Sequence, residues 1–322
     1  MPAVARIKPT TLFTPEQWDW LRQRTPFMGL ALVAHAWGLI GLAIWLAVLQ
    51  PWLIPLSVMI IGARQLGLAI LMHEAAHGLL SGNQKVNDLV GQWLCAAPVG
   101  AQLKAYRPYH LAHHKFTQQA EDPDLVLSAP FPVTKASLRR KIIRDLTGQT
   151  FVKQRLAQVN VALGRLPKGM KGNANISLAA REALGGFLLV NAVLAIVLTL
   201  VGPWWSYPVL WLLPMATWFP LVTRIRNIAE HACVPESGED PLRQARTTRA
   251  NWLEGLLIAP YWVNYHAEHH LFMHLPCYRL PTAHRLLGEN GHRDAMITAP
   301  GYFSVLRAVT MPTSTRPKPA TA

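Results

Sequence analysis

Eight histidines of this chain lie in three short clusters whose spacing suits one face of a helix. The clusters are His73-Glu-Ala-Ala-His77, His110-Leu-Ala-His113-His114 and His266-Ala-Glu-His269-His270. Positions i, i+3 and i+4 share a helical face, so each cluster is expected to present its imidazoles in one direction. Three converging faces would supply more nitrogen ligands than one zinc ion takes. The pattern indicates oxygen activation at paired iron and not metal binding alone.

A ninth histidine is expected to join these clusters. His231 ends the stretch Arg226-Asn227-Ile-Ala-Glu-His231, and Asn227 lies four residues earlier on the same helical face. An amide at that position would hold a metal-bound water. His35 lies within an apolar run and is predicted to form an interhelical hydrogen bond.

Carboxylates next to the clusters are candidates for orienting the histidines. Imidazole is a suitable ligand for iron, but neutral histidines leave the metal charge to be balanced by other groups. A carboxylate that accepts the second ring N–H of a ligand also fixes its tautomer. The candidates, chosen because they are close in sequence, are Glu74, Asp122, Asp124, Glu230 and Glu268. The alternative for each is a surface ion pair with Arg or Lys.

Long apolar runs must position these residues. Phe27–Gln50 and Leu184–Val201 contain no Asp, Glu, Lys or Arg, and runs of about 18 to 24 such residues can span a bilayer. Pro51–Met72 is interrupted by Arg64, and Tyr207–Val222 carries three prolines, which membrane helices tolerate. The sequence therefore predicts an all-α integral membrane protein. Its four transmembrane helices, in two hairpins with a cytoplasmic helical cap carrying the clusters, are expected at about 27–50, 52–78, 184–201 and 207–223.

The domain organisation follows from these runs. A cytoplasmic segment, 1–26, is expected to precede the membrane domain, 27–308, and the proline- and threonine-containing tail, 309–322, is expected to be disordered. The first run begins later than the apolar core of a signal peptide, so it is predicted to be a retained span. Two broken apolar stretches, Leu89–Leu103 and Trp252–Val263, are predicted to be interfacial or re-entrant.

Charge distribution predicts the orientation. The net charge is +14, yet Gln50–Leu53 and Gly202–Tyr207 contain no Lys or Arg. The positive-inside rule then places the N-terminus, the central segment and the C-terminal region in the cytoplasm. We expect a multi-pass protein of a bacterial cytoplasmic membrane, with no nucleic-acid partner. Ser137–Gln158 is basic and amphipathic, and it is either a helix on the lipid surface or a solvated helix.

Arg64 is an exception within the second apolar run. An arginine at the centre of a membrane helix costs about 2.5–3.5 kcal/mol on insertion scales. It is expected either to extend toward the membrane surface or to pair with an anionic group of a lipid or a ligand.

At this point the chain resembles the membrane fatty acid desaturase superfamily, from about residue 27 to residue 290. The resemblance depends on the HxxxH, HxxHH and HxxHH order, on Asn227–His231, and on Thr117 and Glu121-Asp-Pro-Asp124 after the second cluster. It implies a non-haem di-iron centre, with an asparagine matching Asn227 contacting the metal through water in some relatives. The implied ligands are His73, His77, His110, His113, His114, His231, His266, His269 and His270.

The resemblance also implies an activity. Members use O2 and two electrons to introduce a double bond into a fatty acyl chain. No fused cytochrome b5 domain and no His-Pro-Gly-Gly signature is found in the sequence, so electrons are expected from a separate donor of ferredoxin type or similar. A basic cytoplasmic face would suit an acidic partner.

Three alternatives remain open at this point. The same superfamily contains lipid or carotenoid hydroxylases and ketolases. His73-Glu-Ala-Ala-His77 also fits the H-E-x-x-H motif of a membrane zinc metalloprotease, with Glu74 as general base. A histidine-rich metal carrier would require more polar groups within the spans than His35, Arg64 and Asn191.

Overall fold

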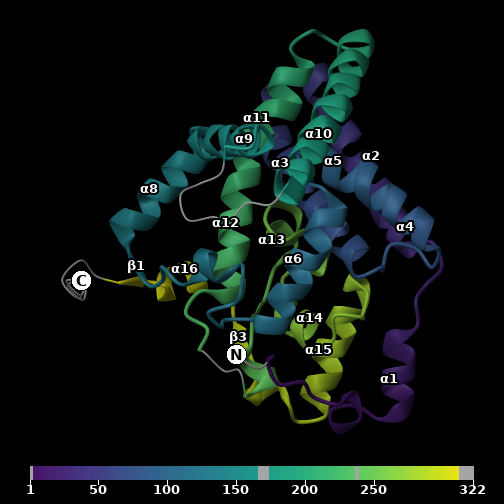
Figure 1. The fold of residues 1–322 in the computed structure, drawn as a ribbon, viewed down its shortest axis with the longest axis vertical. Coiled ribbons are helices and arrows are strands. Elements are labelled where there is room, and N and C mark those ends of the chain that lie inside the picture. Colours follow the sequence, from purple (N-terminus) through teal and green to yellow (C-terminus); the bar gives the residue numbers. More distant parts are fainter. Residues whose placement is uncertain (1–2, 166–173, 236–238, 312–322) are drawn as a thin grey trace.

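The chain folds into a mostly helical structure, known from a computed structural model that describes residues 3–165, 174–235 and 239–311. Figure 1 shows long helices such as α10 at one end and shorter elements such as α14 and α15 toward the other. The α-helices are α1 (Pro15–Arg22), α2 (Met28–Leu49), α3 (Ile54–Ala76), α4 (Gln84–Val90), α5 (Ala97–Val99), α6 (Leu103–Phe116), α7 (Leu125–Ser128), α8 (Lys135–Leu146), α9 (Gln149–Ala162), α10 (Ala174–Val201), α11 (Leu213–Ala216), α12 (Trp218–His231), α13 (Trp252–Leu257), α14 (His266–Leu271), α15 (Leu280–Glu289) and α16 (Tyr302–Ala308).

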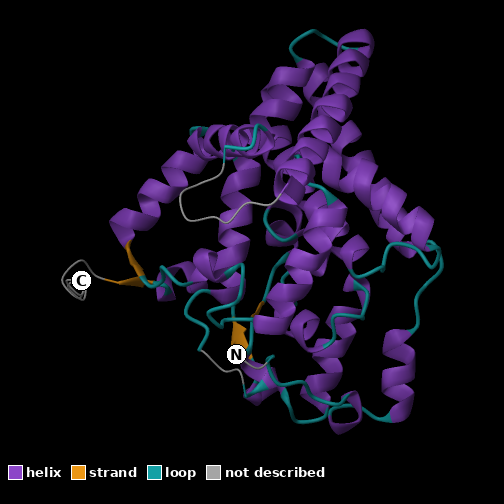
Figure 2. Ribbon diagram, viewed as in Figure 1, coloured by secondary structure: helices purple, strands orange, loops and turns teal. Residues whose placement is uncertain are grey.

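Shorter helical turns and strands complete the described chain (Figure 2). Two π-helical turns, Gly91–Ala96 and Pro208–Leu212, precede α5 and α11. The 3-10 turns are Pro9–Thr11, Pro51–Leu53, Pro241–Arg243, Pro260–Trp262, Cys277–Arg279 and Arg293–Ala295. Strands β1 (Val133–Thr134) and β4 (Thr310–Met311) pair in parallel, as do β2 (Arg246–Thr248) and β3 (Ile297–Ala299). Of the tail predicted to be disordered, residues 312–322 lie outside the described residues, while its start forms β4.

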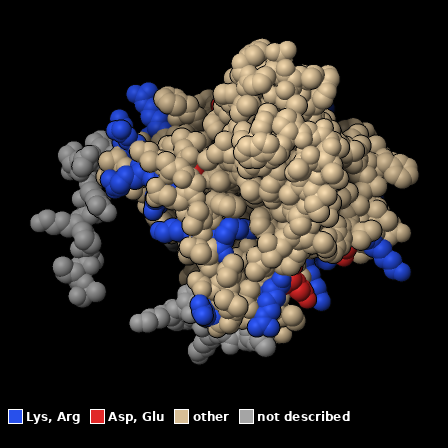
Figure 3. Space-filling view, turned by 90° about the horizontal axis from the view of Figure 1, so that it is seen from above, with Lys and Arg blue, Asp and Glu red and all other residues tan. Residues whose placement is uncertain are grey.

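Among the described residues, four helical segments are long and apolar enough to cross a membrane. They are Met28–Leu49, Pro51–Ala76, Asn175–Val201 and Pro208–His231. In the most apolar 18 residues of the second segment 56% are buried, against 17% in the third. The second segment, which contains α3, is therefore the central helix, and the third presents its side chains outward. Seen from the end where α10 and α11 lie, the surface is largely free of charge, and Lys and Arg gather around its edge (Figure 3).

The last span continues past its predicted end at residue 223. The apolar pattern ends there because two arginines follow, but α12 extends to His231. Both arginines have carboxylate partners: Arg224 binds the buried Asp145 of α8 at 2.5 and 2.8 Å, and Arg226 pairs with Glu230 one turn later. Because both arginines are paired, α12 can continue beyond the point where the apolar pattern ends.

The basic segment predicted as one helix over Ser137–Gln158 is two helices. It divides at Gly148, whose φ of +76° is strained for residues with a side chain. Helices α8 and α9 meet at this residue. The stretch Leu89–Leu103 is likewise divided, into the end of α4, the π-helical turn and α5, with Cys95 buried against the core.

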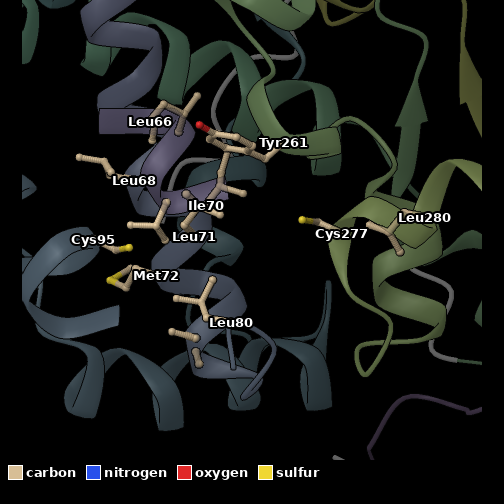
Figure 4. Packing of buried hydrophobic residues seen from close by; sticks show 14 of the residues in the cluster. Leu66, Leu68, Ile70, Leu71, Met72, Leu80, Cys95, Tyr261, Cys277 and Leu280 are labelled. Atoms are coloured by element: carbon tan, nitrogen blue, oxygen red, sulfur yellow. The ribbon is translucent and has the colours of Figure 1, made fainter. Parts of the chain in front are cut away.

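The main core surrounds α3. Leu66 lies beside Tyr261, and Met72 lies near Cys95 from the π-helical turn (Figure 4). A second, smaller core joins α8, α12 and α16 through Leu138, Ile228 and Tyr302. The two cores hold the C-terminal ends of α3 and α12 in place, and both ends carry histidines.

Candidate metal centre

Four helices supply the nine histidines of the sequence prediction. His73 and His77 lie at the C-terminal end of α3, and His231 is the last residue of α12. Helix α6 carries the second cluster and α14 the third. Seven of the nine side chains are buried, and His73 and His77 are partly exposed.

The structure brings these histidines together in two groups. Within each group, one ligand atom per residue lies within 4.8 Å of the others. We call them group 1 and group 2. Group 1 contains His73, His77, His110, His114 and His269. Group 2 contains His113, His231, His266 and His270.

The grouping corrects the expectation that each cluster faces in one direction. In α6 the residues at i and i+4, His110 and His114, belong to group 1, while the residue at i+3, His113, belongs to group 2. Helix α14 does the reverse, with His266 and His270 in group 2 and His269 in group 1. At about 100° per residue, position i+4 lies about 40° from position i around the helix axis, and position i+3 lies about 60° from it in the opposite direction. Each HxxHH cluster therefore reaches both groups.

Neighbouring ring nitrogens within each group are separated by distances typical of two ligands of the same metal ion. In group 1, Nε2 of His110 lies 3.0 Å from Nε2 of His77 and 2.9 Å from that of His114. In group 2, Nε2 of His266 lies 2.9 Å from Nε2 of His231 and 3.0 Å from that of His270. Imidazole nitrogens bind metal ions at about 2.0–2.1 Å, so neighbouring ligands of one ion lie about 3 Å apart. The donor sets fit a pair of metal ions.

The state of the imidazoles supports the same fit. Nε2 of His73 is buried and has no hydrogen-bond partner. Burial and the neighbouring imidazoles hold the pKa of His110, His114, His269 and His270 well below its usual range. Burial, with His274 and Arg107, lowers the pKa of His77 to about 3. Neutral rings keep the lone pair that a metal requires.

Of the predicted carboxylates, Asp122 is the one placed to orient a ligand. Its Oδ1 lies 2.8 Å from Nδ1 of His113, and its Oδ2 accepts the backbone N–H of Gln118 at 2.8 Å. Asp124 is less close, with Oδ2 at 3.8 Å from the same Nδ1. A carboxylate on Nδ1 favours the tautomer whose Nε2 is free for a metal.

The three glutamates differ in how closely they approach the histidines. Oε1 of Glu74 is 3.6 Å from Nδ1 of its neighbour His73, but its Oε2 accepts the N–H of Cys277 at 2.8 Å. Oε2 of Glu230 is 3.4 Å from Nε2 of His266, the nitrogen that faces group 2. Glu268 contacts Thr247 and His284 instead. Residues one or two positions from a ligand do not share its helical face.

Other contacts were not anticipated from the sequence. Arg6 donates to the backbone oxygens of His114 at 2.8 Å and His270 at 3.2 Å, so the N-terminal segment connects α6 with α14. The ring of Tyr106 stacks on His110 at 5.3 Å, one turn earlier in α6. Of these two contacts, only that of Tyr106 could be predicted from sequence spacing, because Tyr106 is four residues before His110.

A cavity adjoins the histidines. It has a volume of about 170 Å³ and is lined by His73, His266 and His269 together with apolar residues of α3 such as Ile70 and Met72. Arg226 also lines it and donates to Oδ1 of Asn227 at 3.2 Å. The donor sets therefore open onto a mostly apolar space.

Comparison with known proteins identifies the family. The model of the family described as fatty acid desaturase matches residues 49–298. The chain belongs to the fatty acid desaturase family. Membership confirms the resemblance found in the sequence. The four long apolar helices and the two histidine groups agree with this membership.

Individual relatives of this desaturase-family chain have different reactions. A dihydrorhizobitoxine desaturase of Bradyrhizobium elkanii is 28% identical over 79% of this chain and 70% of its own length. An sn-1 oleoyl-lipid 12-desaturase of Anabaena variabilis is 24% identical over 78% and 74%. A beta-carotene ketolase of a Paracoccus strain is 23% identical over 67% and 73%. The chain spans 60% of the chloroplastic omega-6 fatty acid desaturase of Spinacia oleracea, at 26% identity.

Proposed function

We propose that this chain is a membrane oxidoreductase that uses O2 to introduce a double bond into a fatty acyl chain. Two iron ions would be held by the nine histidines of groups 1 and 2. The observation that carries the proposal is the pair of mostly buried imidazole donor sets beside a mostly apolar cavity in a chain of the fatty acid desaturase family.

The reaction requires a strong oxidant because an unactivated methylene has no acidic proton. A di-iron centre, when bound, supplies that oxidant from O2. The protein's own part is to hold and orient the groups around it. Asp122 keeps His113 in one tautomer, Arg6 fixes the carbonyls of His114 and His270, and the apolar wall of α3 excludes water from the cavity.

Asn227 is proposed to complete group 2 through a water molecule. Group 1 has two histidine pairs at i and i+4, in α3 and α6, and the single His269. Group 2 has one such pair and two single histidines, His113 and His231. Asn227 occupies the position four residues before His231, where a second pair would have its other member. Glu74, Asp124, Glu230 and Glu268 are proposed as carboxylates of the surrounding shell, alongside Asp122.

The membrane arrangement is proposed from the sequence and the four spans. Two hairpins would place the ends of α3 and α12, both termini and the histidine-bearing cap on the cytoplasmic side of a bacterial membrane. Electrons would come from a separate protein, and the basic edge of the molecule suits an acidic donor of ferredoxin type.

Hydroxylation or ketolation is the second candidate because a beta-carotene ketolase is among the relatives. In the metalloprotease alternative Glu74 would be the general base, but its Oε2 accepts the backbone N–H of Cys277. This alternative would also leave most of the nine histidines without a role.

Expression in a host of defined lipid composition, followed by lipidomics with double-bond mapping, tests the proposal. We expect a lipid product that has lost two hydrogens. We also expect the purified protein to contain two irons per chain. His113→Ala and His269→Ala should abolish product while the protein stays membrane-inserted, and His292→Ala, outside both groups, should not. A product that has gained an oxygen atom would favour hydroxylation or ketolation. A single zinc per chain, or full turnover by either ligand variant, would refute the di-iron proposal.

A further inference from the structure

Arg64 is a buried cation within the second membrane span. Its side chain is 3% exposed, and its Nη2 donates to the backbone oxygens of Leu256 at 2.7 Å and Gly255 at 3.3 Å. Its Nε is buried and has no hydrogen-bond partner. Across the described residues no carboxylate forms an ion pair with it. A charge at this depth is costly, so a buried arginine without a counter-ion is unusual.

Arg64 lines a second pocket, separate from the cavity at the histidines. This pocket has a volume of about 640 Å³ and lies between α2, α3 and the segment that runs from Ala250 to Tyr265. Its polar lining includes His35, Asn251 and Asn264 in addition to Arg64. Polar side chains therefore gather in it around one positive charge that has no carboxylate partner among the described residues.

Two residues, Tyr261 and Trp262, line both the pocket and the cavity. The guanidinium carbon of Arg64 lies 5.4 Å from the ring centre of Tyr261, and Nδ1 of His35 lies 3.2 Å from its hydroxyl. Tyr261 and Trp262 thus form the wall between the two spaces, and Tyr261 contacts Arg64 and His35 of the pocket.

The backbone of this wall is strained. Tyr261 and Trp262 have φ values of +55° and +56°, in the left-handed region that bulky residues rarely adopt. Tyr261 also packs so closely on α3 that a methyl group on Gly67 would lie 2.6 Å from its Cε2. Strain of this kind persists where the surroundings impose it, and it is concentrated at ligand clamps and active sites.

We propose that Arg64 binds the oxyanion headgroup of an amphiphilic ligand, a carboxylate or a phosphate, whose chain passes Tyr261 and Trp262 toward the histidines. The planar guanidinium suits either anion. Arg64 and His73 are nine residues apart in α3, about 13.5 Å along the helix axis, so the metal centre would face the middle of a chain and not its head. That the ligand is the substrate rests on the proposed function, whereas the anion site depends only on the pocket.

Binding measurements test the site without turnover. The full chain, purified with its bound metal in an uncharged detergent and kept under argon, is titrated calorimetrically with palmitate, hexadecyl phosphate and hexadecanol. We expect palmitate or hexadecyl phosphate to bind about tenfold or more tightly than hexadecanol, as a buried charge-assisted hydrogen bond predicts. The anion that shows the preference identifies the source of the headgroup.

Arg64→Gln should remove this preference and leave hexadecanol binding unchanged. Arg285→Gln, which removes an exposed arginine paired with Glu289, should keep it. Should Arg64→Gln fail to fold, Ala31→Phe fills the pocket from the exposed face of α2 and should weaken the binding of all three ligands. Equal binding of anions and alcohol by the wild type, or an unchanged preference in Arg64→Gln, would overturn the inference.

The two proposals fail in different ways. A wild-type protein that binds the anions no better than the alcohol but still produces a desaturated lipid would remove only the role of Arg64. Arg64-dependent anion binding without any oxidised product would keep the site and remove the proposed reaction.

Discussion

Asp122→Asn tests whether the orientation of a single imidazole controls metal binding. Asp122 is 6% exposed and accepts from three groups: Nδ1 of His113, the N–H of Gln118 and the N–H of Asp124. Asparagine has one acceptor oxygen, so its amide nitrogen must face one of these donors. The change also removes the charge that strengthens the bond to His113.

The expected magnitude follows from these contacts. Loss of an orienting partner weakens metal affinity or activity about 10–100-fold, or about 1.4–2.8 kcal/mol. A buried donor without an acceptor should lower the free energy of unfolding by about 1–3 kcal/mol. Iron per chain measured during titration with a chelator gives the affinity, and circular dichroism during heating follows the fold.

Asp124→Asn is the matched control. Its carboxylate is 3.8 Å from the same Nδ1, too far for a hydrogen bond, and its other oxygen is bound to the hydroxyl of Tyr109. It should retain iron almost as the wild type does. If Asp122→Asn kept wild-type affinity, or if both variants lost iron equally, the orienting role of Asp122 would be refuted.

Two further predictions concern the supports of the site. Asp145→Ala leaves Arg224 without its buried partner and should lower the free energy of unfolding by about 3 kcal/mol, seen as a lower thermal midpoint; an unchanged midpoint would show that the pair does not hold α8 on α12. Arg6→Ala removes two charge-assisted bonds to the carbonyls of His114 and His270 and should speed iron release about tenfold, measured by transfer to a chelator, with helical content retained. Equal rates of iron release from the wild type and Arg6→Ala would show that the contacts of Arg6 do not help to retain the metal.

The positions of the long apolar helices are largely predictable from the sequence. Met28–Leu49 agrees with its predicted span to within a residue at each end because nothing interrupts the apolar run. The end of α12 was not predictable, since the partner of Arg224 is Asp145, distant in the chain. A hydropathy pattern does not contain such pairings.

The histidines were predictable as candidates but not in their arrangement. Spacing places His110 beside His114 and His266 beside His270, yet no rule of spacing states which helix they face. The glutamates show the same limit: closeness in sequence suggested Glu268, while the fold directs it to Thr247 and His284. Asp122, nine residues after His113, reaches it only because the chain turns back after α6.

The division of each HxxHH cluster between the two groups has a mechanical consequence. Helices α6 and α14 each serve both donor sets, so neither helix can rotate to improve one set without disturbing the other. The rotation of each helix about its own axis is thereby fixed by the geometry of both donor sets. A substitution at a single residue on α6 or α14 should therefore disturb both donor sets, and metal ions bound at the two sets would be gained and lost together.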